Sequence, residues 1–342
     1  MKIFINAFLE GNLGDDIFVD LLLDRYPNHN FYTLSSDYLP TKNLKVFSNE
    51  FFIKVIRKLS LKSLFANRCD LSVTIGGSMF MEQKGDATRN FSLGKKPYYI
   101  MGINFGPYKS QTYFDNIHSY FKDAEDICFR EEYSYNLFKD LPNTRWVPDI
   151  VFSMDTSNIK ITNNKRVVFS IISCSRKIEE KHTGNYEKKI IQMTKFFINK
   201  GYDICYMSFS KREGDEDAIA SILNKCDEEL KQKISVYNYR GNRKEALEEL
   251  ANSQIIVGGR FHANILGMLL GKTIIPMLYS NKTKNVLDNM NFKGKIIDIR
   301  TLNEADLHEE ISDKDLEYKQ DIQYEIEHAE EHFKKLDKIL RN

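Results

Sequence analysis

Short runs of β-branched and aromatic residues alternate with longer stretches of helical periodicity along most of the chain. The runs that predict strands before residue 155 are 2–8, 70–75, 97–103, 126–129 and 145–147. Those after residue 165 are 166–172, 202–209, 234–239, 254–257, 273–278 and 295–298. Apolar strands separated by helices are typical of parallel sheets that helices cover on both faces. The pattern therefore predicts an α/β fold.

A polar, turn-prone stretch at 155–165 divides the two groups of strands and is the best candidate for a linker. We expect two Rossmann-like domains facing a central cleft, the first at 1–158 and the second at 159–312. Ligands bind at the carboxyl ends of strands in such sheets, so both domains should present their strand ends to the cleft. The charged helical pattern at 313–342 is expected to pack back on the N-terminal domain as one long helix.

The composition suits a two-domain globular enzyme, with 342 residues, 42% hydrophobic and 28% charged. A net charge of +1, from 49 basic and 48 acidic side chains, argues against a nucleic-acid partner. The cysteines form no C-x-x-C pair and are expected to be buried free thiols. They are Cys69, Cys128, Cys174, Cys205 and Cys226. Neither a signal peptide nor an apolar run of about 18 residues is apparent, so we expect a cytoplasmic protein.

The first strand is followed by a loop, Gly11-Asn12-Leu13-Gly14-Asp15-Asp16, which precedes a helical run at 17–26. Asp15 or Asp16 is predicted to cap that helix. The loop is either an ordinary strand-to-helix turn or a site where Asn12 and Asp15 hold a sugar hydroxyl. The G-x-G-x-x-G fingerprint of dinucleotide-binding proteins is absent.

Glycine clusters and polar residues follow the next strands. Gly77 and Asn104 lie in the sequences Gly-Gly-Ser and Gly-Ile-Asn-Phe-Gly-Pro, where glycines allow a ligand to approach the backbone. Arg130 follows another strand, either as an ion-pair partner of neighbouring acids or facing the cleft. Asp149 is expected to be a cap or hinge residue.

The strongest local pattern is Gly258-Gly259-Arg260-Phe261-His262-Ala263-Asn264, between a strand and a helix. A helix N-terminus favours anions, and an arginine adds a planar fork for phosphate or carboxylate. A histidine can donate a proton near neutral pH. Arg176, Lys177 and Lys282 also follow strands and could add positive charge, although exposed lysines are common. No cluster with metal-ligand spacing is apparent, so no metal is predicted.

These stretches, in this order, resemble the polysaccharide pyruvyl transferase family from residue 11 to about residue 290. The matching stretches are Gly11–Asp15, Gly76-Gly77, Gly102–Pro107, Arg130-Glu131 with Ser134, Pro148-Asp149, Gly259–Ala263, and Tyr279 with Lys282. The family commonly has a serine two residues before the arginine, where this chain has Gly258.

The resemblance implies a glycosyltransferase-B-like fold and phosphoenolpyruvate as the donor, with no cofactor. It implies a ketal product in which pyruvate bridges two hydroxyls of a sugar. His262 would be the catalytic acid, and Asp15 is the candidate for the acceptor side of catalysis. The C-terminal domain would bind the donor through Arg260, Arg176, Lys282, Phe261 and Tyr279. The N-terminal domain would bind the acceptor through Asn12, Asp15, Gly77, Asn104 and Arg130.

Two other functions remain open at this point. A nucleotide-sugar-dependent glycosyltransferase of the same architecture could use the helix start at Arg260 to hold a diphosphate. A sugar-binding protein with a degenerate site is the third candidate, and the retained Arg260-x-His262 element argues against it.

The stretch 51–65 is apolar and basic with no acidic residue. On a helix, one face would carry Phe52, Val55, Ile56, Leu59 and Phe65, and the others Lys54, Arg57, Lys58 and Lys62. Such a helix either packs in the core with a solvated basic edge or rests on anionic lipid. The resemblance supports the second case, because the acceptor would be a sugar or a lipid-linked saccharide. We therefore expect peripheral contact with the inner face of the membrane.

Overall fold

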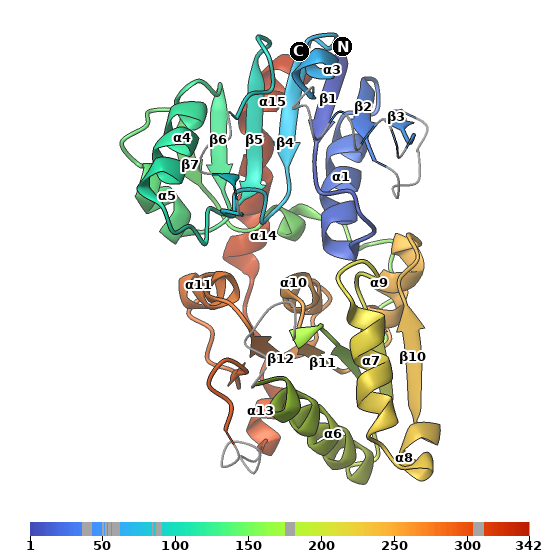
Figure 1. Ribbon diagram of the computed structural model, residues 1–342. Coiled ribbons are helices and arrows are strands. Elements are labelled where there is room, and N and C mark those ends of the chain that lie inside the picture. The colour runs from blue at the N-terminus through green and yellow to red at the C-terminus, as the bar shows by residue number, and fades with distance from the viewer. Residues whose placement is uncertain are drawn as a thin grey trace. The chain divides into compact units, whose positions relative to one another are not determined.

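The computed structural model describes residues 1–35, 43–49, 51, 53, 56, 62–83, 85–86, 91–174, 182–303 and 311–341. The chain forms two compact units. Unit 1 comprises Met1–Glu10, Asp15–Met154 and Tyr324–Asn342, and unit 2 comprises Gly11–Gly14 and Asp155–Gln323. Each unit contains a parallel sheet with helices between most of the successive strands (Figure 1). The structure thus confirms the predicted α/β class.

The sheet of unit 1 has the strand order β3-β2-β1-β4-β5-β6-β7, with every pairing parallel. The strands are β1 (Lys2–Asn6), β2 (Asn30–Leu34), β3 (Leu44–Phe47), β4 (Leu71–Ile75), β5 (Tyr98–Ile103), β6 (Asp126–Phe129) and β7 (Thr144–Trp146). The chain adds strands on one side of β1 as far as β3 and then on the other side from β4 onward, as in Rossmann-like folds. The carboxyl ends of β4, β5 and β6 consequently lie beside one another.

The strands that the sequence predicts best are the buried ones. Every residue of β4, β5 and β6 is buried, although β4 includes the hydroxyl residues Ser72 and Thr74. The edge strand β3 and its neighbour β2 were not predicted. Only Phe31 and Thr33 are buried in β2 and only Leu44 in β3, so most of their positions are polar or partly exposed.

The helices of unit 1 before its last strand are α1 (Leu13–Arg25), α3 (Lys62–Ala66), α4 (Gln111–Lys122) and α5 (Glu132–Phe138). Helix α1 begins four residues before the predicted run. Asn12 caps it, because Asn12 Oδ1 accepts a hydrogen bond from Gly14 N at 3.0 Å. The prediction that Asp15 or Asp16 is the cap is therefore wrong. Both lie in the first turn, where their charge complements the helix dipole.

The predicted long C-terminal helix is broken into shorter pieces. They are α13 (Asp313–Glu317), α14 (Gln323–Ala329), η5 (Glu330–Phe333) and α15 (Lys334–Leu340). Residues from Tyr324 onward belong to unit 1. There, Arg145 donates to the carbonyls of Glu331 and His332 at 2.8 and 3.0 Å, and Arg25 forms a bidentate pair with Asp337. The two chain termini lie at the same end of unit 1 (Figure 1).

The sheet of unit 2 has the order β10-β9-β8-β11-β12-β13, again with parallel pairings. Its strands are β8 (Arg166–Ser170), β9 (Asp203–Ser208), β10 (Ile234–Asn238), β11 (Ile255–Gly258), β12 (Thr273–Leu278) and β13 (Ile297–Asp298). Its helices, apart from α13, include α6 (Thr183–Asn199), α7 (Asp215–Asn224), α8 (Glu228–Gln232), α9 (Arg243–Ala251), α10 (Phe261–Leu269) and α11 (Asn281–Asn289). The turns after β8, β9 and β11 therefore meet at one edge of the sheet.

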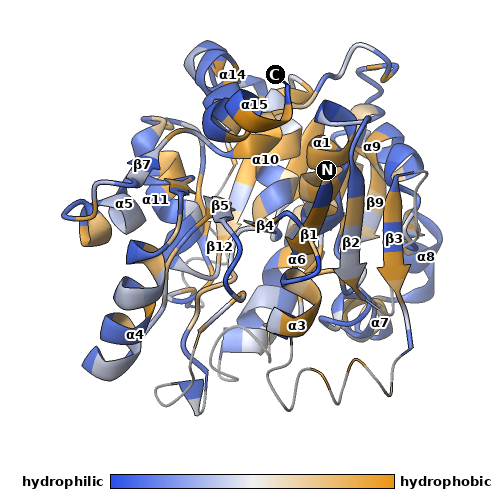
Figure 2. Ribbon diagram, turned by 90° about the horizontal axis from the view of Figure 1, so that it is seen from above, coloured by the Kyte–Doolittle hydropathy of each residue, from blue (hydrophilic) through white to orange (hydrophobic). Residues whose placement is uncertain are grey.

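Strand β3 and helices α1 and α10 carry many hydrophobic residues, whereas α4 and α8 are largely hydrophilic (Figure 2). The core of unit 2 includes Phe169, Tyr206 and Val257 from adjacent strands. All five cysteines are buried free thiols, as predicted. The described part of the chain contains no helix long and apolar enough to cross a membrane.

The predicted linker is anchored on unit 2 near its end. Lys272 is buried, and its Nζ donates to the carbonyls of Thr162 and Ala251 at 2.5 and 2.6 Å. Thr162 N also donates to Ala251 O at 3.1 Å. The division between the units falls between Met154 and Asp155, at the start of this stretch.

Candidate functional site

Two glycines lead from the end of β11 into α10. Gly259 N donates to Ser170 O at 3.0 Å, and a side chain on Gly259 would collide with that carbonyl. A Cβ atom on Gly258 would lie 2.5 Å from Cγ of Asn264. The Asn264 amide donates to the carbonyls of Gly258 and Arg260, both at 3.1 Å. Gly259 thus permits the close backbone approach, and Gly258 leaves room for the Asn264 amide.

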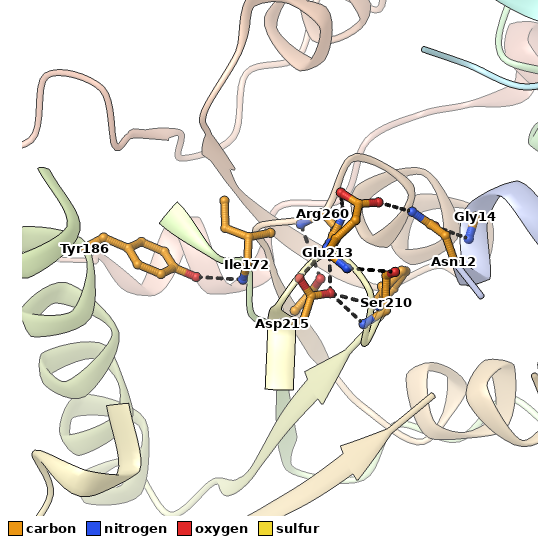
Figure 3. A network of polar contacts seen from close by, with 10 residues as sticks. Asn12, Gly14, Ile172, Tyr186, Ser210, Glu213, Asp215 and Arg260 are labelled. Carbon is orange, nitrogen blue, oxygen red and sulfur yellow. Dashed lines mark hydrogen bonds and ion pairs between the residues drawn. The ribbon is translucent and has the colours of Figure 1, made fainter. Parts of the chain in front are cut away.

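Arg260, the N-cap residue of α10 at the end of this turn, is buried and bound by two carboxylates (Figure 3). Its Nε donates to Asp215 Oδ2 at 2.9 Å, its Nη2 donates to Asp215 Oδ1, and its Nη1 donates to Glu213 Oε2 at 2.6 Å. Burial tends to lower the pKa of Arg260, but the charges of Asp215 and Glu213 outweigh it and raise that pKa. The planar fork that was predicted to hold the donor is therefore engaged by Asp215.

Asp215 is the first residue of α7 and is wholly buried. Its Oδ2 also accepts hydrogen bonds from the backbone N–H groups of Phe209 and Ser210, at 3.0 and 2.9 Å. One carboxylate thus joins the β9–α7 loop to the guanidinium at the start of α10. Gly214 precedes it with a φ of 85°, a left-handed conformation that glycine adopts without strain.

Glu213 continues the network to the loop at Gly11–Gly14 (Figure 3). Its Oε1 accepts a hydrogen bond from Asn12 Nδ2 at 2.7 Å, and its side chain is 22% exposed. Leu13 N donates to Phe209 O at 3.1 Å. Asn12, which was predicted to bind the acceptor, therefore lies in unit 2 and contacts the carboxylate that holds Arg260.

His262 is half-buried in the first turn of α10, beside the aromatic ring of Phe261. Its imidazole packs directly on the backbone of Gly14. A Cβ atom at Gly14 would lie 2.8 Å from Cε1 of His262 and closer still to Nδ1. His262, the candidate proton donor, thus lies at the positive end of α10. Its imidazole fits there because Gly14 has no side chain.

Tyr279 and Lys282 follow β12 at the same edge of the sheet. Lys282 Nζ lies 5.3 Å from the centroid of the Tyr279 ring, a cation–π distance. Tyr279 also contributes to raising the pKa of Arg260. Arg176 and Lys177 lie outside the described residues. All of the predicted donor-binding residues that the structure describes belong to unit 2.

Three of the residues predicted for the acceptor come together in unit 1. Arg130 Nη2 donates to Asn104 Oδ1 at 2.7 Å, and its Nη1 donates to Asp149 Oδ2 at 3.1 Å. A Cβ atom on Gly77 would lie 2.5 Å from Cζ of Arg130, so the guanidinium rests on the glycine backbone. Arg130 is therefore an ion-pair partner, as in the first of the two interpretations of the sequence, and its partner is Asp149.

Asp149 also caps the short helix η2 (Ile150–Ser153) through a hydrogen bond from Val151 N at 3.0 Å. Burial raises the pKa of the Asp149 carboxyl, while the charge of Arg130 opposes that rise. Asp15 is half-buried in the first turn of α1, where a Cβ atom at Gly76 would lie 3.8 Å from its Oδ1. Asp15 therefore lies near the carboxyl end of β4, next to the Gly77 segment.

Glu213 and Asp215 were not predicted from the sequence. They lie in the loop between β9 and α7 and at the first residue of α7, in the sequence Lys-Arg-Glu-Gly-Asp. The position of the loop at the carboxyl end of a strand is the one sequence signal that points to them. Within the described ranges, no three His, Cys, Asp or Glu side chains are grouped as metal ligands would be.

Comparison with solved structures supports the fold. UDP-GlcNAc 2-epimerase from Methanocaldococcus jannaschii superimposes with a TM-score of 0.59 at 10% identity, covering 100% of this chain and 99% of the epimerase. Trehalose-6-phosphate synthase superimposes with a TM-score of 0.51 at 10% identity, covering 98% and 95%. At such low identity these similarities establish the glycosyltransferase-B-like architecture alone.

Comparison of sequences is more specific. The amylovoran biosynthesis protein AmsJ of Erwinia amylovora is 21% identical over 343 aligned positions, which cover 84% of this chain and 81% of AmsJ. The family description of polysaccharide pyruvyl transferases matches residues 12–281, which include the Asn12 loop, the Arg130 cluster and the Arg260 turn. Because the match spans most of both units, the chain belongs to the polysaccharide pyruvyl transferase family and is a transferase.

Proposed function

We propose that this enzyme transfers the pyruvyl group of phosphoenolpyruvate onto two hydroxyls of a sugar in a polysaccharide or its precursor. The product is a ketal, and phosphate is released. The observation that carries the proposal is the start of α10, where Arg260 and His262 stand together at the positive end of a helix. That turn supplies a cation, a proton donor and a helix dipole to an anionic donor.

The chemistry requires a proton donor and stabilisation of anions. Protonation of the methylene carbon of phosphoenolpyruvate leaves an electrophilic carbon at C2. A sugar hydroxyl adds to C2, the bond from C2 to the phosphate oxygen breaks, and a second hydroxyl closes the ketal. One hydroxyl proton balances the proton gained by the new methyl group, and the other leaves with phosphate. No electrons are transferred, so we propose that no redox cofactor takes part.

In this proposal His262 protonates the donor, and Arg260, Lys282 and Arg176 offset its negative charge. Phe261 and Tyr279 flank the donor. Since Asn12 binds Glu213 beside Arg260, we assign Asn12 to the donor region as well as to the helix cap.

The acceptor sugar is assigned to unit 1, at the carboxyl ends of β4, β5 and β6. Asp15 is the candidate base for a sugar hydroxyl, and Gly77, Asn104 and Arg130 would position the saccharide. Because Arg130 is already paired with Asp149, its contribution is to hold the amide of Asn104 in place. The amide and backbone groups would then recognise the neutral hydroxyls.

We propose further that the enzyme acts in the cytoplasm on a lipid-linked saccharide and touches the inner face of the membrane through 51–65. Phe51 is 73% exposed and Leu64 is 54% exposed, which supports contact with lipid. Ile53 and Ile56 are buried, which favours the interpretation that part of this segment packs in the core. Most of the basic face, including Lys54, Arg57 and Lys58, lies outside the described residues.

Flotation with anionic vesicles at low salt tests this contact. The wild type should float, and a variant with the four basic residues changed to Gln should not. A basic residue near such a surface contributes about 1 kcal/mol, so four give reversible attachment. Equal behaviour of the two proteins would leave 51–65 as a core segment.

Thermal-shift titration with phosphoenolpyruvate and with several nucleotide sugars tests the donor. A ligand that binds only the native state raises the melting temperature, so phosphoenolpyruvate alone should do so. Stabilisation by a nucleotide sugar instead would support the glycosyltransferase alternative. EDTA should not reduce the rate of transfer, because the proposed charge stabilisation comes from side chains and the α10 N-terminus.

A further inference from the structure

The Glu213 carboxylate is held at two points by side chains. One oxygen accepts from Arg260 Nη1 at 2.6 Å and the other accepts from Asn12 Nδ2 at 2.7 Å. A carboxylate bound by a guanidinium on one side and an amide on the other is held as a ligand carboxylate would be. Glu213 thus fills an anion-binding position next to the start of α10.

The ion-paired group of Arg260, Asp215 and Glu213 offers no excess positive charge to an anion while Glu213 is in place. Arg260 carries one positive charge, and Asp215 and Glu213 each carry one negative charge, so this ion-paired group has a net charge of −1. Phosphoenolpyruvate carries both a phosphate and a carboxylate. The group therefore repels the donor unless one carboxylate leaves Arg260.

The two carboxylates differ in how easily they can leave. Asp215 is wholly buried and accepts from two backbone N–H groups, which its departure would strand without partners. Glu213 lies in a loop with its side chain 22% exposed, and both contacts described above are to side chains. Water can solvate Glu213 as it moves away. By these contacts, displacement of Glu213 from Arg260 costs less than displacement of Asp215.

We propose that Glu213 is a displaceable internal anion, which occupies the anion-binding position of Arg260 in the free enzyme and is replaced by an anionic group of the donor. This inference rests on the proposed function for the identity of the donor. It makes Glu213 a residue that sets donor affinity without touching the reacting atoms. In this proposal Asn12, besides capping α1, also stabilises the contact between Glu213 and Arg260 in the free enzyme.

Isothermal titration of the full chain with phosphoenolpyruvate tests this exchange. Glu213→Gln removes the competing charge, so the variant should bind the donor roughly three- to tenfold more tightly, in proportion to the weakened ion pair. Glu216→Gln is the matched control, because Glu216 pairs with exposed Arg240 rather than with Arg260. The affinity of this control should stay within about twofold of the wild type, since Glu216 is paired with a partly exposed arginine outside the Arg260 group. In steady-state assays Glu213→Gln should lower KM more than it changes kcat.

Equal or weaker binding by Glu213→Gln would overturn the proposal, because Glu213 would then be a fixed partner that holds Arg260 in place. If Glu213→Gln does not fold, as judged by circular dichroism, Glu213→Asp replaces it. The shorter side chain weakens the contact with Arg260 but keeps the charge, so a smaller gain in affinity is expected and no gain refutes the exchange.

Titration with inorganic phosphate separates this inference from the proposed function. Tighter phosphate binding by Glu213→Gln, together with no binding of phosphoenolpyruvate by any of the proteins, would uphold the exchange and refute the donor. Unchanged binding of both anions by the variant, with clear binding of phosphoenolpyruvate by the wild type, would refute the exchange and leave the donor intact.

Discussion

Replacing Gly14 with alanine should displace His262 without altering the histidine itself. Gly14 is the second residue of α1, and it is not among the glycines with positive φ, so its backbone accepts alanine. The new methyl carbon would lie 2.8 Å from Cε1 of His262 and closer still to Nδ1. Ordinary contact between carbon atoms needs about 3.5–4.0 Å, so the imidazole has to move by about 1 Å or more.

The expected effect on the rate follows from that displacement. Moving a catalytic group by about 1 Å costs on the order of 10² in rate, so kcat should fall by about that factor. Stability should change little, since alanine is favoured over glycine in helices by up to about 1 kcal/mol and partly offsets the strain. Phosphate release from phosphoenolpyruvate, with a saccharide on which the wild type turns over, measures kcat. A thermal melt measures stability.

Gly184→Ala is the matched control for this variant. Gly184 is the second residue of α6, and a Cβ atom there would meet nothing within 4 Å. Gly184→Ala should therefore keep the wild-type rate. A Gly14→Ala enzyme that folds normally and turns over at the wild-type rate would refute the assignment of His262 as the catalytic acid. Loss of activity together with loss of the fold would refute the estimate of small strain.

Three further predictions concern buried polar groups. Asp215→Asn breaks a buried ion pair with Arg260 and should lower the free energy of unfolding by about 3–5 kcal/mol; an unchanged urea midpoint contradicts this. Gly77→Ala should push the guanidinium of Arg130 from its place, weakening acceptor binding more than donor binding in separate titrations, and equal effects would contradict the assignment of the acceptor to unit 1. His332 is wholly buried, and burial lowers its pKa from 6.5 to about 3. Between these values the unfolded chain binds more protons, so stability falls as the pH drops below 6.5, by up to roughly 1.4 kcal/mol per pH unit. His332→Asn should reduce that slope in urea titrations, and an unchanged slope would show that His332 is protonated in the folded state.

Much of the fold could be predicted from the sequence because the buried parallel strands are short runs rich in β-branched and aromatic residues between helical stretches. Strands β4, β5 and β6 are buried at every position, and each was predicted to within one residue of its structural bounds. The edge strand β3 and its neighbour β2 were missed, since most positions of both are polar or partly exposed. Helix α1 was predicted to begin too late, because the cap formed by Asn12 lies within a glycine-rich loop.

The site was predictable in its positions more than in its contacts. Strand ends and glycines placed Arg260, Arg130 and Gly77 after β11, β6 and β4, where the structure has them, and His262 at the start of α10. What the sequence could not supply was the partner of each arginine. Asp215 and Glu213 lie about 45 residues from Arg260 in the chain, and only the strand order brings the two turns together. The break in the C-terminal helical pattern after Glu317 could not be predicted either, because charged residues are spread along the whole segment without a clear stop signal.

Identification of the product tests the central claim most directly. The enzyme is incubated with phosphoenolpyruvate labelled with ¹³C at C2 and with candidate saccharides, and the products are analysed by ¹³C NMR. We predict that the labelled carbon appears as a ketal carbon joined to two oxygens of one sugar, with one phosphate released for each ketal. A labelled carbon that remains in phosphoenolpyruvate or appears only as free pyruvate, while the same saccharides gain a sugar from a nucleotide-sugar donor, would contradict it.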